Sequence, residues 1–82
     1  MRVAVDISLY PLDRDFIPPI SDVIERLNSH EGLEVWTNAM STQVVGEFAE
    51  VWNALGQEIG QTFENLPKGI FVMKMLNNPG EA

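Results

Sequence analysis

Apolar and polar residues alternate along residues 2–11. Four apolar side chains share one parity, and this set is Val3, Val5, Ile7 and Leu9. The opposite parity includes Asp6, Ser8 and Tyr10, and Pro11 ends the run. A period of two is typical of a strand with one buried face. We therefore expect a strand over residues 2–11 whose apolar side meets the core and whose other side carries Asp6, Ser8 and Tyr10.

Two segments carry apolar residues at helical spacing. The first starts at Pro18 or Pro19, which suit the first turn of a helix, and Gly32 is expected to end it. Its apolar stripe is Ile20, Val23, Ile24 and Leu27. The second segment follows Glu47, and Pro67 stops it. Its apolar positions are Phe48, Val51, Trp52, Leu55, Ile59, Phe63 and Leu66. This spacing predicts that Trp52 belongs to the core rather than to a site.

Three short strands complete the chain, over residues 33–38, 41–46 and 69–76. The few residues between the first two fit a hairpin. The resulting order, βαββαβ, is the split βαβ or ferredoxin-like plan. Right-handed crossovers place both helices on one face of a four-stranded antiparallel sheet. We expect a single α+β domain over residues 1–82, with the other face of the sheet left open.

Side-chain parity predicts the composition of that open face. Lys74 under the helices would be a costly buried charge, so we place it on the open side together with Ile70 and Val72. The ferredoxin-like plan sets the last strand beside the first, where Asp6 and Lys74 can pair. Trp36 has the parity of the same surface. An apolar face with one charged pair fits a subunit interface, so we expect a homodimer or homotetramer.

Composition narrows the partners. The chain has 82 residues, no cysteine and a formal net charge of -7. A domain this small has a marginal core, and no disulfide or thiolate zinc site supplements it, which favours oligomerisation. The acidic surface argues against nucleic acid and against anionic membranes. No export signal and no run of membrane-spanning length is found, so a cytoplasmic location is expected.

Two short motifs resemble a known family. A strand ends in Ser8–Pro11, a Ser-aliphatic-Tyr-Pro sequence, and Met40–Thr42 with Gly46 forms a Met-Ser-Thr-x-x-x-Gly segment before the second helix. In order, spacing and element pattern the chain resembles the YkoF-like thiamine-binding family. The resemblance implies a ferredoxin-like fold, dimers or tetramers built through the sheets, and binding of thiamine or its hydroxymethylpyrimidine half.

The chain departs from the family pattern at two places in the second motif. Many members have Gly-Pro before the Met, where this chain has Asn38 and Ala39, and an acidic residue before the Gly, where Val45 stands.

An aminopyrimidine offers an amine donor and ring-nitrogen acceptors, so its pocket needs oriented polar groups and flat apolar walls. The candidate ligand-binding residues are Asp6, Ser8, Trp36, Asn38, Ser41 and Thr42. Trp36 or Tyr10 would supply a stacking wall, and Asp6 would face a cationic or amine group.

Each candidate also has a purely structural interpretation. Ser41 and Thr42 would satisfy backbone groups of a turn. For Asp6, an ion pair with Lys74 is favoured over a ligand contact. Trp36 serves interface packing at least as well as stacking.

Catalysis has little support in the sequence. There is no cysteine nucleophile, and the one histidine, His30, lies at the expected end of the first helix, where it can interact with the helix dipole. No phosphate loop, zinc spacing or Ser/His/Asp set is found. Carboxylates are scattered, mostly on helix faces, where we expect them to be solvated. We therefore expect no enzyme, cofactor or metal, and weigh two functions: a carrier or sensor of a small molecule, and an oligomeric interaction or regulatory module without a metabolite.

Overall fold

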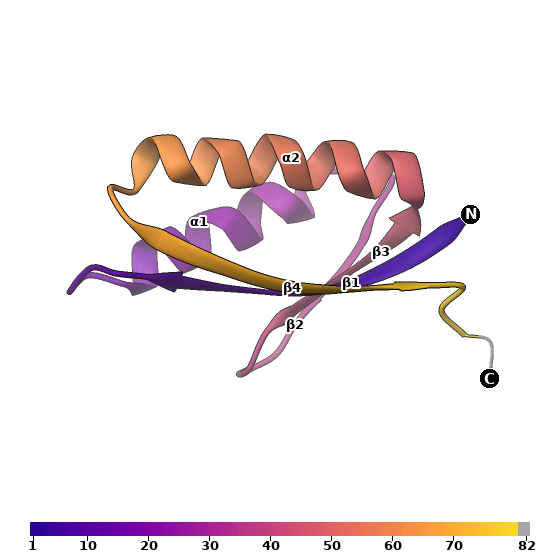
Figure 1. The fold of residues 1–82 in the computed structure, drawn as a ribbon, viewed down its shortest axis with the longest axis horizontal. Helices are drawn as coiled ribbons and strands as arrows, with labels where there is room; N and C mark the ends of the chain where they lie inside the picture. The colour runs from indigo at the N-terminus through magenta and orange to yellow at the C-terminus, as the bar shows by residue number, and fades with distance from the viewer. Residues whose placement is uncertain (81–82) are drawn as a thin grey trace.

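The computed structural model describes residues 1–80. Its elements are β1 (Arg2–Pro11), α1 (Ile17–Asn28), β2 (Glu34–Thr37), β3 (Thr42–Glu47), α2 (Phe48–Asn65) and β4 (Gly69–Asn77). The strands form one antiparallel sheet in the order β2-β3-β1-β4. Both helices cover the same face of this sheet, above it in Figure 1. The predicted ferredoxin-like α+β fold is confirmed.

The core lies between the helices and the sheet. The predicted inward parity of β1 is confirmed, because Val3, Val5, Ile7 and Leu9 are all buried. They belong to one cluster with Val44 of β3, Val23 and Leu27 of α1, and Val51 and Leu55 of α2. The exposed fraction of the Val44 and Val51 side chains is 0%. This single layer of branched apolar side chains holds both helices against the two central strands.

The first helix is shorter than its sequence predicts. Prolines occupy the first helical positions as expected, but α1 ends at Asn28 instead of continuing to Gly32. The amides of Ser29 and His30 donate to carbonyls three residues earlier, 3.2 Å away in each case, and the Ser29 hydroxyl donates to the Arg26 carbonyl at 2.6 Å. These bonds tighten the last turn and end the helix before the glycine. His30 therefore lies in the loop that leads to β2.

The two helices are joined by a buried polar network, which was not predicted. Glu58 was expected to be solvated with the other helix carboxylates, yet its exposed fraction is 4%. Arg26 donates to Glu58 Oε1 at 2.6 Å and to Thr62 Oγ1 at 2.7 Å, and Nε2 of His30 lies 2.6 Å from Glu58 Oε2. Burial raises the pKa of Glu58, but the hydrogen bonds from His30 and Arg26 outweigh it, so the net pKa is lowered. Glu58 is thus held ionised between the helices.

The prediction that Trp52 lies in the core is wrong. Its exposed fraction is 56%, and its ring stacks on Phe48 with centroids 6.0 Å apart. The side chains of Val51 and Leu55 pack against the sheet instead and are buried. Trp52 borders a groove of about 230 Å³ that is also lined by Met73 of β4. The apolar stripe of α2 is wider than the surface that the sheet offers to it.

The junction of β3 and α2 depends on a close approach at Gly46. A Cβ atom there would lie 3.0 Å from Cδ2 of Leu33 and 3.3 Å from Cγ2 of Val51. A Cβ atom would require these side chains to shift by a few tenths of an ångström, so glycine lets Leu33 and Val51 close the core at this corner without displacement.

Candidate functional site

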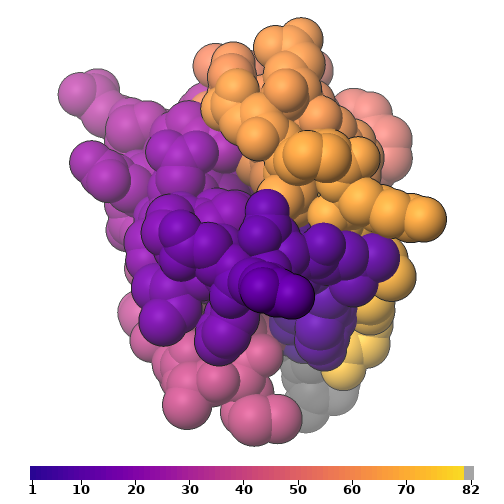
Figure 2. All heavy atoms as spheres, turned by 90° about the vertical axis from the view of Figure 1, so that its left-hand side faces the viewer, coloured from indigo at the N-terminus to yellow at the C-terminus, as the bar shows by residue number. Residues whose placement is uncertain are grey.

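Four of the six predicted site residues border one cavity. Ser8, Asn38, Ser41 and Thr42 line a space of about 140 Å³ between β1, α1 and the tip of the β2–β3 hairpin. The apolar part of its lining is Ile7, Leu9, Ile20, Ile24, Ala39 and Met40. We call this space the hairpin cavity. In the space-filling view of this end of the molecule, the hairpin (pink) projects directly below α1 (purple) (Figure 2). The other two candidates, Asp6 and Trp36, are not part of this lining.

A pair of threonine hydroxyls lies at the cavity. Thr42 has an exposed fraction of 6%, and its Oγ1 is 3.0 Å from Oγ1 of Thr37, its partner across β2 and β3. One hydroxyl donates to the other, so the accepting hydroxyl keeps a proton for another acceptor. Thr37 also lines the cavity and was missed by the sequence analysis. Its position directly opposite Thr42 in the hairpin register is the signal that could have identified it.

Asn38 has a structural role in the hairpin turn. Its Oδ1 accepts hydrogen bonds from the amides of Met40 at 2.8 Å and Ser41 at 3.1 Å. Its own amide donates to the Ser41 carbonyl at 3.0 Å. This is an Asx turn, in which a side-chain oxygen replaces a backbone acceptor. The oxygen of Asn38 is therefore engaged, whereas its Nδ2 donors have no hydrogen-bond partner among residues 1–80.

Asp6 belongs to a polar row on the open face of the sheet. The strand register sets Trp36, Gln43, Asp6 and Lys74 side by side on adjacent strands. Ser41 donates to Asp6 Oδ1 at 2.5 Å, Gln43 donates to the same atom at 2.8 Å, and Lys74 Nζ lies 3.9 Å from Oδ2. The bond from Ser41, then that from Gln43, lower the pKa of Asp6, and Lys74 adds a smaller effect. The predicted proximity of Asp6 and Lys74 is confirmed, with Ser41 and Gln43 as the closer partners.

Apolar side chains surround this row. The exposed fraction is 50% or more for each of Tyr10, Trp36, Ile70, Val72 and Leu76. In the register, Val72 lies opposite Ser8 and Ile70 opposite Tyr10, which places them on the side away from the helices, as their parity predicts. A shallow depression of about 320 Å³ runs along the row beside Asp6, Lys74 and Leu76. The open face is therefore apolar with a polar centre.

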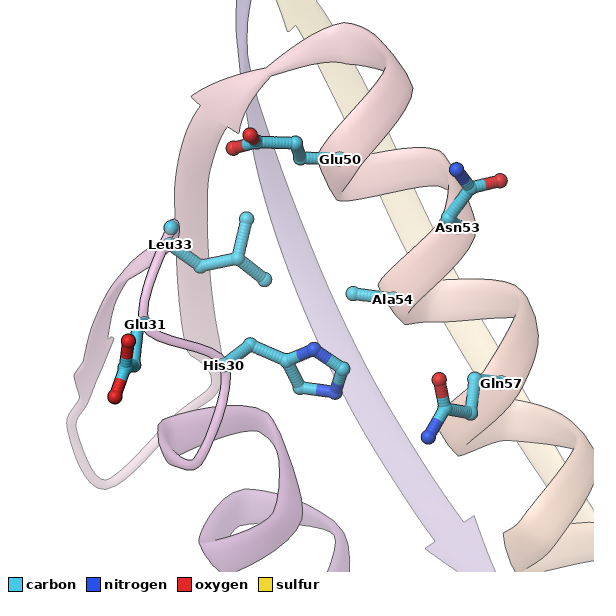
Figure 3. Close-up of a pocket in the computed structure, with 8 residues that line it drawn as sticks. His30, Glu31, Leu33, Glu50, Asn53, Ala54 and Gln57 are labelled. Atoms are coloured by element: carbon cyan, nitrogen blue, oxygen red, sulfur yellow. The ribbon is translucent and has the colours of Figure 1, made fainter.

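A second polar hollow lies between α2 and the loop after α1. It has a volume of about 280 Å³ and includes His30, Glu50 and Gln57 in its lining (Figure 3). His30 was expected to interact with the dipole of the first helix, but the contact that its side chain makes is with Glu58 of α2. Within residues 1–80 no three histidine, cysteine or acidic side chains are grouped to hold a metal ion. Neither helix in that part of the chain is long and apolar enough to cross a bilayer.

Solved structures share this fold over almost the whole chain. A protein from Thermotoga maritima, described as a candidate thiamine biosynthesis/salvage protein, is 20% identical with a TM-score of 0.85, and the match covers 100% of this chain and 89% of that one. A protein from Streptococcus pneumoniae is 23% identical with a TM-score of 0.87, and the match covers 99% and 89% of the two chains. At these identities the likeness shows the fold alone.

Family membership rests on the sequence itself. No curated protein matches the chain. The sequence profile of the YKOF-related family matches residues 2–76, which include both motifs and all six elements except Asn77, the last residue of β4. The chain belongs to the YKOF-related family.

Proposed function

We propose that this protein binds thiamine or a hydroxymethylpyrimidine-type precursor reversibly in the hairpin cavity, without chemical turnover. The observation that carries the proposal is the Thr37–Thr42 hydroxyl pair, of which Thr42 is buried, in a cavity with apolar walls. Family membership and the Thermotoga maritima neighbour, described as a candidate thiamine biosynthesis/salvage protein, support the ligand class.

The polar groups at the cavity suit an aminopyrimidine ring. The spare proton of the threonine pair and the Nδ2 donors of Asn38 can bond ring nitrogens, which accept. The lone pairs of Ser8 and of the threonine hydroxyls can accept from the exocyclic amine. Ser8 is available for this because its bond to the Met40 carbonyl, at 3.4 Å, is long. Ile7 and Ile24 offer apolar surface to the ring faces.

The size of the cavity favours one ring over two. Its volume of about 140 Å³ is below the roughly 300–1,000 Å³ of pockets that enclose drug-sized ligands. A pyrimidine precursor fits this scale better than intact thiamine. We propose that a second subunit completes the site for the larger ligand, by covering the open face near the hairpin. In such an oligomer Asp6 and Trp36, which lie on that face, can approach the exposed part of the ligand.

Calorimetric titration with thiamine and with hydroxymethylpyrimidine tests the proposal. We expect Thr42→Val to weaken binding by about ten- to a hundredfold, because a ligand polar group loses its partner at a cost of roughly 1–3 kcal/mol. The matched control is Ser21→Ala, which removes an exposed hydroxyl of α1 outside the cavity. Thermal melts establish that each variant is folded. Unchanged affinity in folded Thr42→Val would contradict the proposal and leave the pair a purely structural role.

The second candidate function is an oligomeric interaction or regulatory module without a metabolite. The apolar open face favours it, because that surface requires no cavity and no ligand. The engagement of Asn38 Oδ1 in a turn and of Ser41 with Asp6 also fits a structural role for the motif. Absence of heat with either compound, together with sedimentation as an oligomer, would favour this candidate.

A further inference from the structure

The hollow between α2 and the α1–β2 loop has its own chemistry. No residue of its lining is shared with the hairpin cavity, so the two are separate features of the molecule. Figure 3 shows His30 and Gln57 extending toward each other across it, with Leu33 and Ala54 between them and Glu50. Glu31 is turned away on the outer side of the loop. Polar acceptors thus stand at both ends of a short apolar wall.

The contact with Glu58 determines which nitrogen of His30 can serve the hollow. A carboxylate only accepts hydrogen bonds, so Nε2 of His30 donates to Glu58 Oε2 across 2.6 Å. In the neutral ring, Nδ1 is then a lone-pair acceptor. Nδ1 has no hydrogen-bond partner among residues 1–80, and it retains contact with solvent. While the His30 ring is neutral, the network between the helices therefore orients a free acceptor at the hollow.

Glu50 adds a carboxylate without a basic partner. Its Oε2 lies 2.6 Å from where a Cβ of Gly32 would be, so the absence of that side chain lets the carboxylate fold over the loop. Within the described residues no basic group is within 4.0 Å of it. Arg26, on the other side of Glu58, already bonds Asp22, Glu58 and Thr62 through its three nitrogens. The hollow therefore presents uncompensated negative charge, which attracts cations.

We propose that this hollow binds a small organic cation, with a primary ammonium or amidinium head and a short apolar body. The head donates to Nδ1 of His30 and to the amide oxygen of Gln57, which extend toward each other, while the body lies on Leu33 and Ala54 and the Glu50 carboxylate beyond them attracts the charge. A volume of about 280 Å³ suits a compound of this size. The inference does not depend on the pyrimidine site, because a different set of residues carries it.

Amide NMR titrations with three compounds test the chemistry. The probes are 3-methylbutylammonium, the neutral 3-methyl-1-butanol, and the N,N,N-trimethyl form of the amine, which keeps the charge but has no N–H donor. We expect saturable shifts from the first probe in residues 30–33 and 50–57, and weaker binding of the other two. Equal binding of the alcohol, shifts in residues 37–42 instead, or no saturable shift with the ammonium would each overturn the proposal.

Variants assign the binding to named side chains. Glu50→Gln keeps the shape and removes the charge, and we expect ammonium binding to weaken about two- to fivefold. The matched control, Glu64→Gln, makes the same change on an exposed residue of α2 outside the hollow and should bind normally. His30→Gln keeps an N–H that can reach Glu58 but lacks Nδ1, and should also bind less tightly.

Equal loss in Glu50→Gln and Glu64→Gln would overturn a local site and indicate a general charge effect. Titration of Glu50→Gln with hydroxymethylpyrimidine separates the two proposals, because binding in the hairpin cavity should be unchanged.

Discussion

Nη1 of Arg26 lies 2.6 Å from Oε1 of Glu58, and this contact joins the last turn of α1 to the middle of α2. Glu58 is buried, whereas the Arg26 side chain retains an exposed fraction of 21%. Arg26 also donates to the backbone carbonyl of Glu58 at 3.0 Å. Thr62 accepts a hydrogen bond from Arg26 and His30 donates one to Glu58, so no buried side-chain polar atom among residues 1–80 lacks a partner. A satisfied buried network of this kind specifies how two helices align.

Breaking the pair on one side should destabilise the fold strongly. We expect Glu58→Ala to lower the free energy of unfolding by about 2–4 kcal/mol, because Arg26 keeps a partly buried charge, loses its buried carboxylate partner and retains only the exposed Asp22. The double variant Arg26→Met/Glu58→Met should recover much of that loss, since apolar side chains of similar length can fill the space. Urea denaturation of the wild type and the variants measures both effects. A double variant as unstable as Glu58→Ala would show that the network is needed for more than charge balance.

The lowered pKa of Glu58 predicts acid sensitivity. A carboxyl whose pKa is lower in the folded state than in the unfolded state stabilises the fold above its unfolded pKa. That contribution is lost as pH falls from the ordinary value of 4.5 through the lower folded value. We therefore expect stability to decline in that interval. Glu58→Gln has nothing to titrate there, so its free energy of unfolding should depend less on pH below 4.5. Parallel curves for both proteins would contradict this assignment.

Ser41 should control the ionisation of Asp6. The hydrogen bond from Ser41 is the main cause of the lowered Asp6 pKa, followed by that from Gln43. We expect Ser41→Ala to raise the Asp6 pKa toward its ordinary 3.8, and Lys74→Met to raise it less. Carboxyl carbon shifts followed by NMR during a pH titration report both changes. A larger effect from Lys74→Met would mean that the ion pair dominates after all.

The open sheet face should mediate association. Val72 is 52% exposed near the centre of β4, on the side away from the helices. If a second copy covers this face, Val72→Lys buries a charge without a partner and should weaken self-association by at least about tenfold. Gln61→Lys changes the charge equally on the exposed surface of α2 and serves as the control. Sedimentation velocity at a series of concentrations measures both. A monomeric wild type at micromolar concentration would contradict the prediction.

The local pattern of the chain determined the element order and the inward face of β1. It also determined that Asp6 and Lys74 share the open surface, because strand parity and ferredoxin-like connectivity depend only on nearby residues and chain order. The polar side chains of the two motifs, together with the family resemblance, identified Ser8, Asn38, Ser41 and Thr42, which the fold gathers at one cavity. A short polar motif next to a hairpin turn stays together however the rest of the chain packs.

Only the tertiary structure shows that Glu58 is buried, that Trp52 is exposed and that His30 contacts Glu58. His30 and Glu58 are 28 residues apart, and helical periodicity does not show how closely two helices approach or which polar groups meet there. Likewise, the helical period of α2 includes Trp52 among the apolar positions. It does not show that the sheet, whose edge strand is β4, leaves the Trp52 side chain exposed. Periodicity describes the geometry within one element. Burial depends on the width and position of the neighbouring element, and only packing in three dimensions sets these.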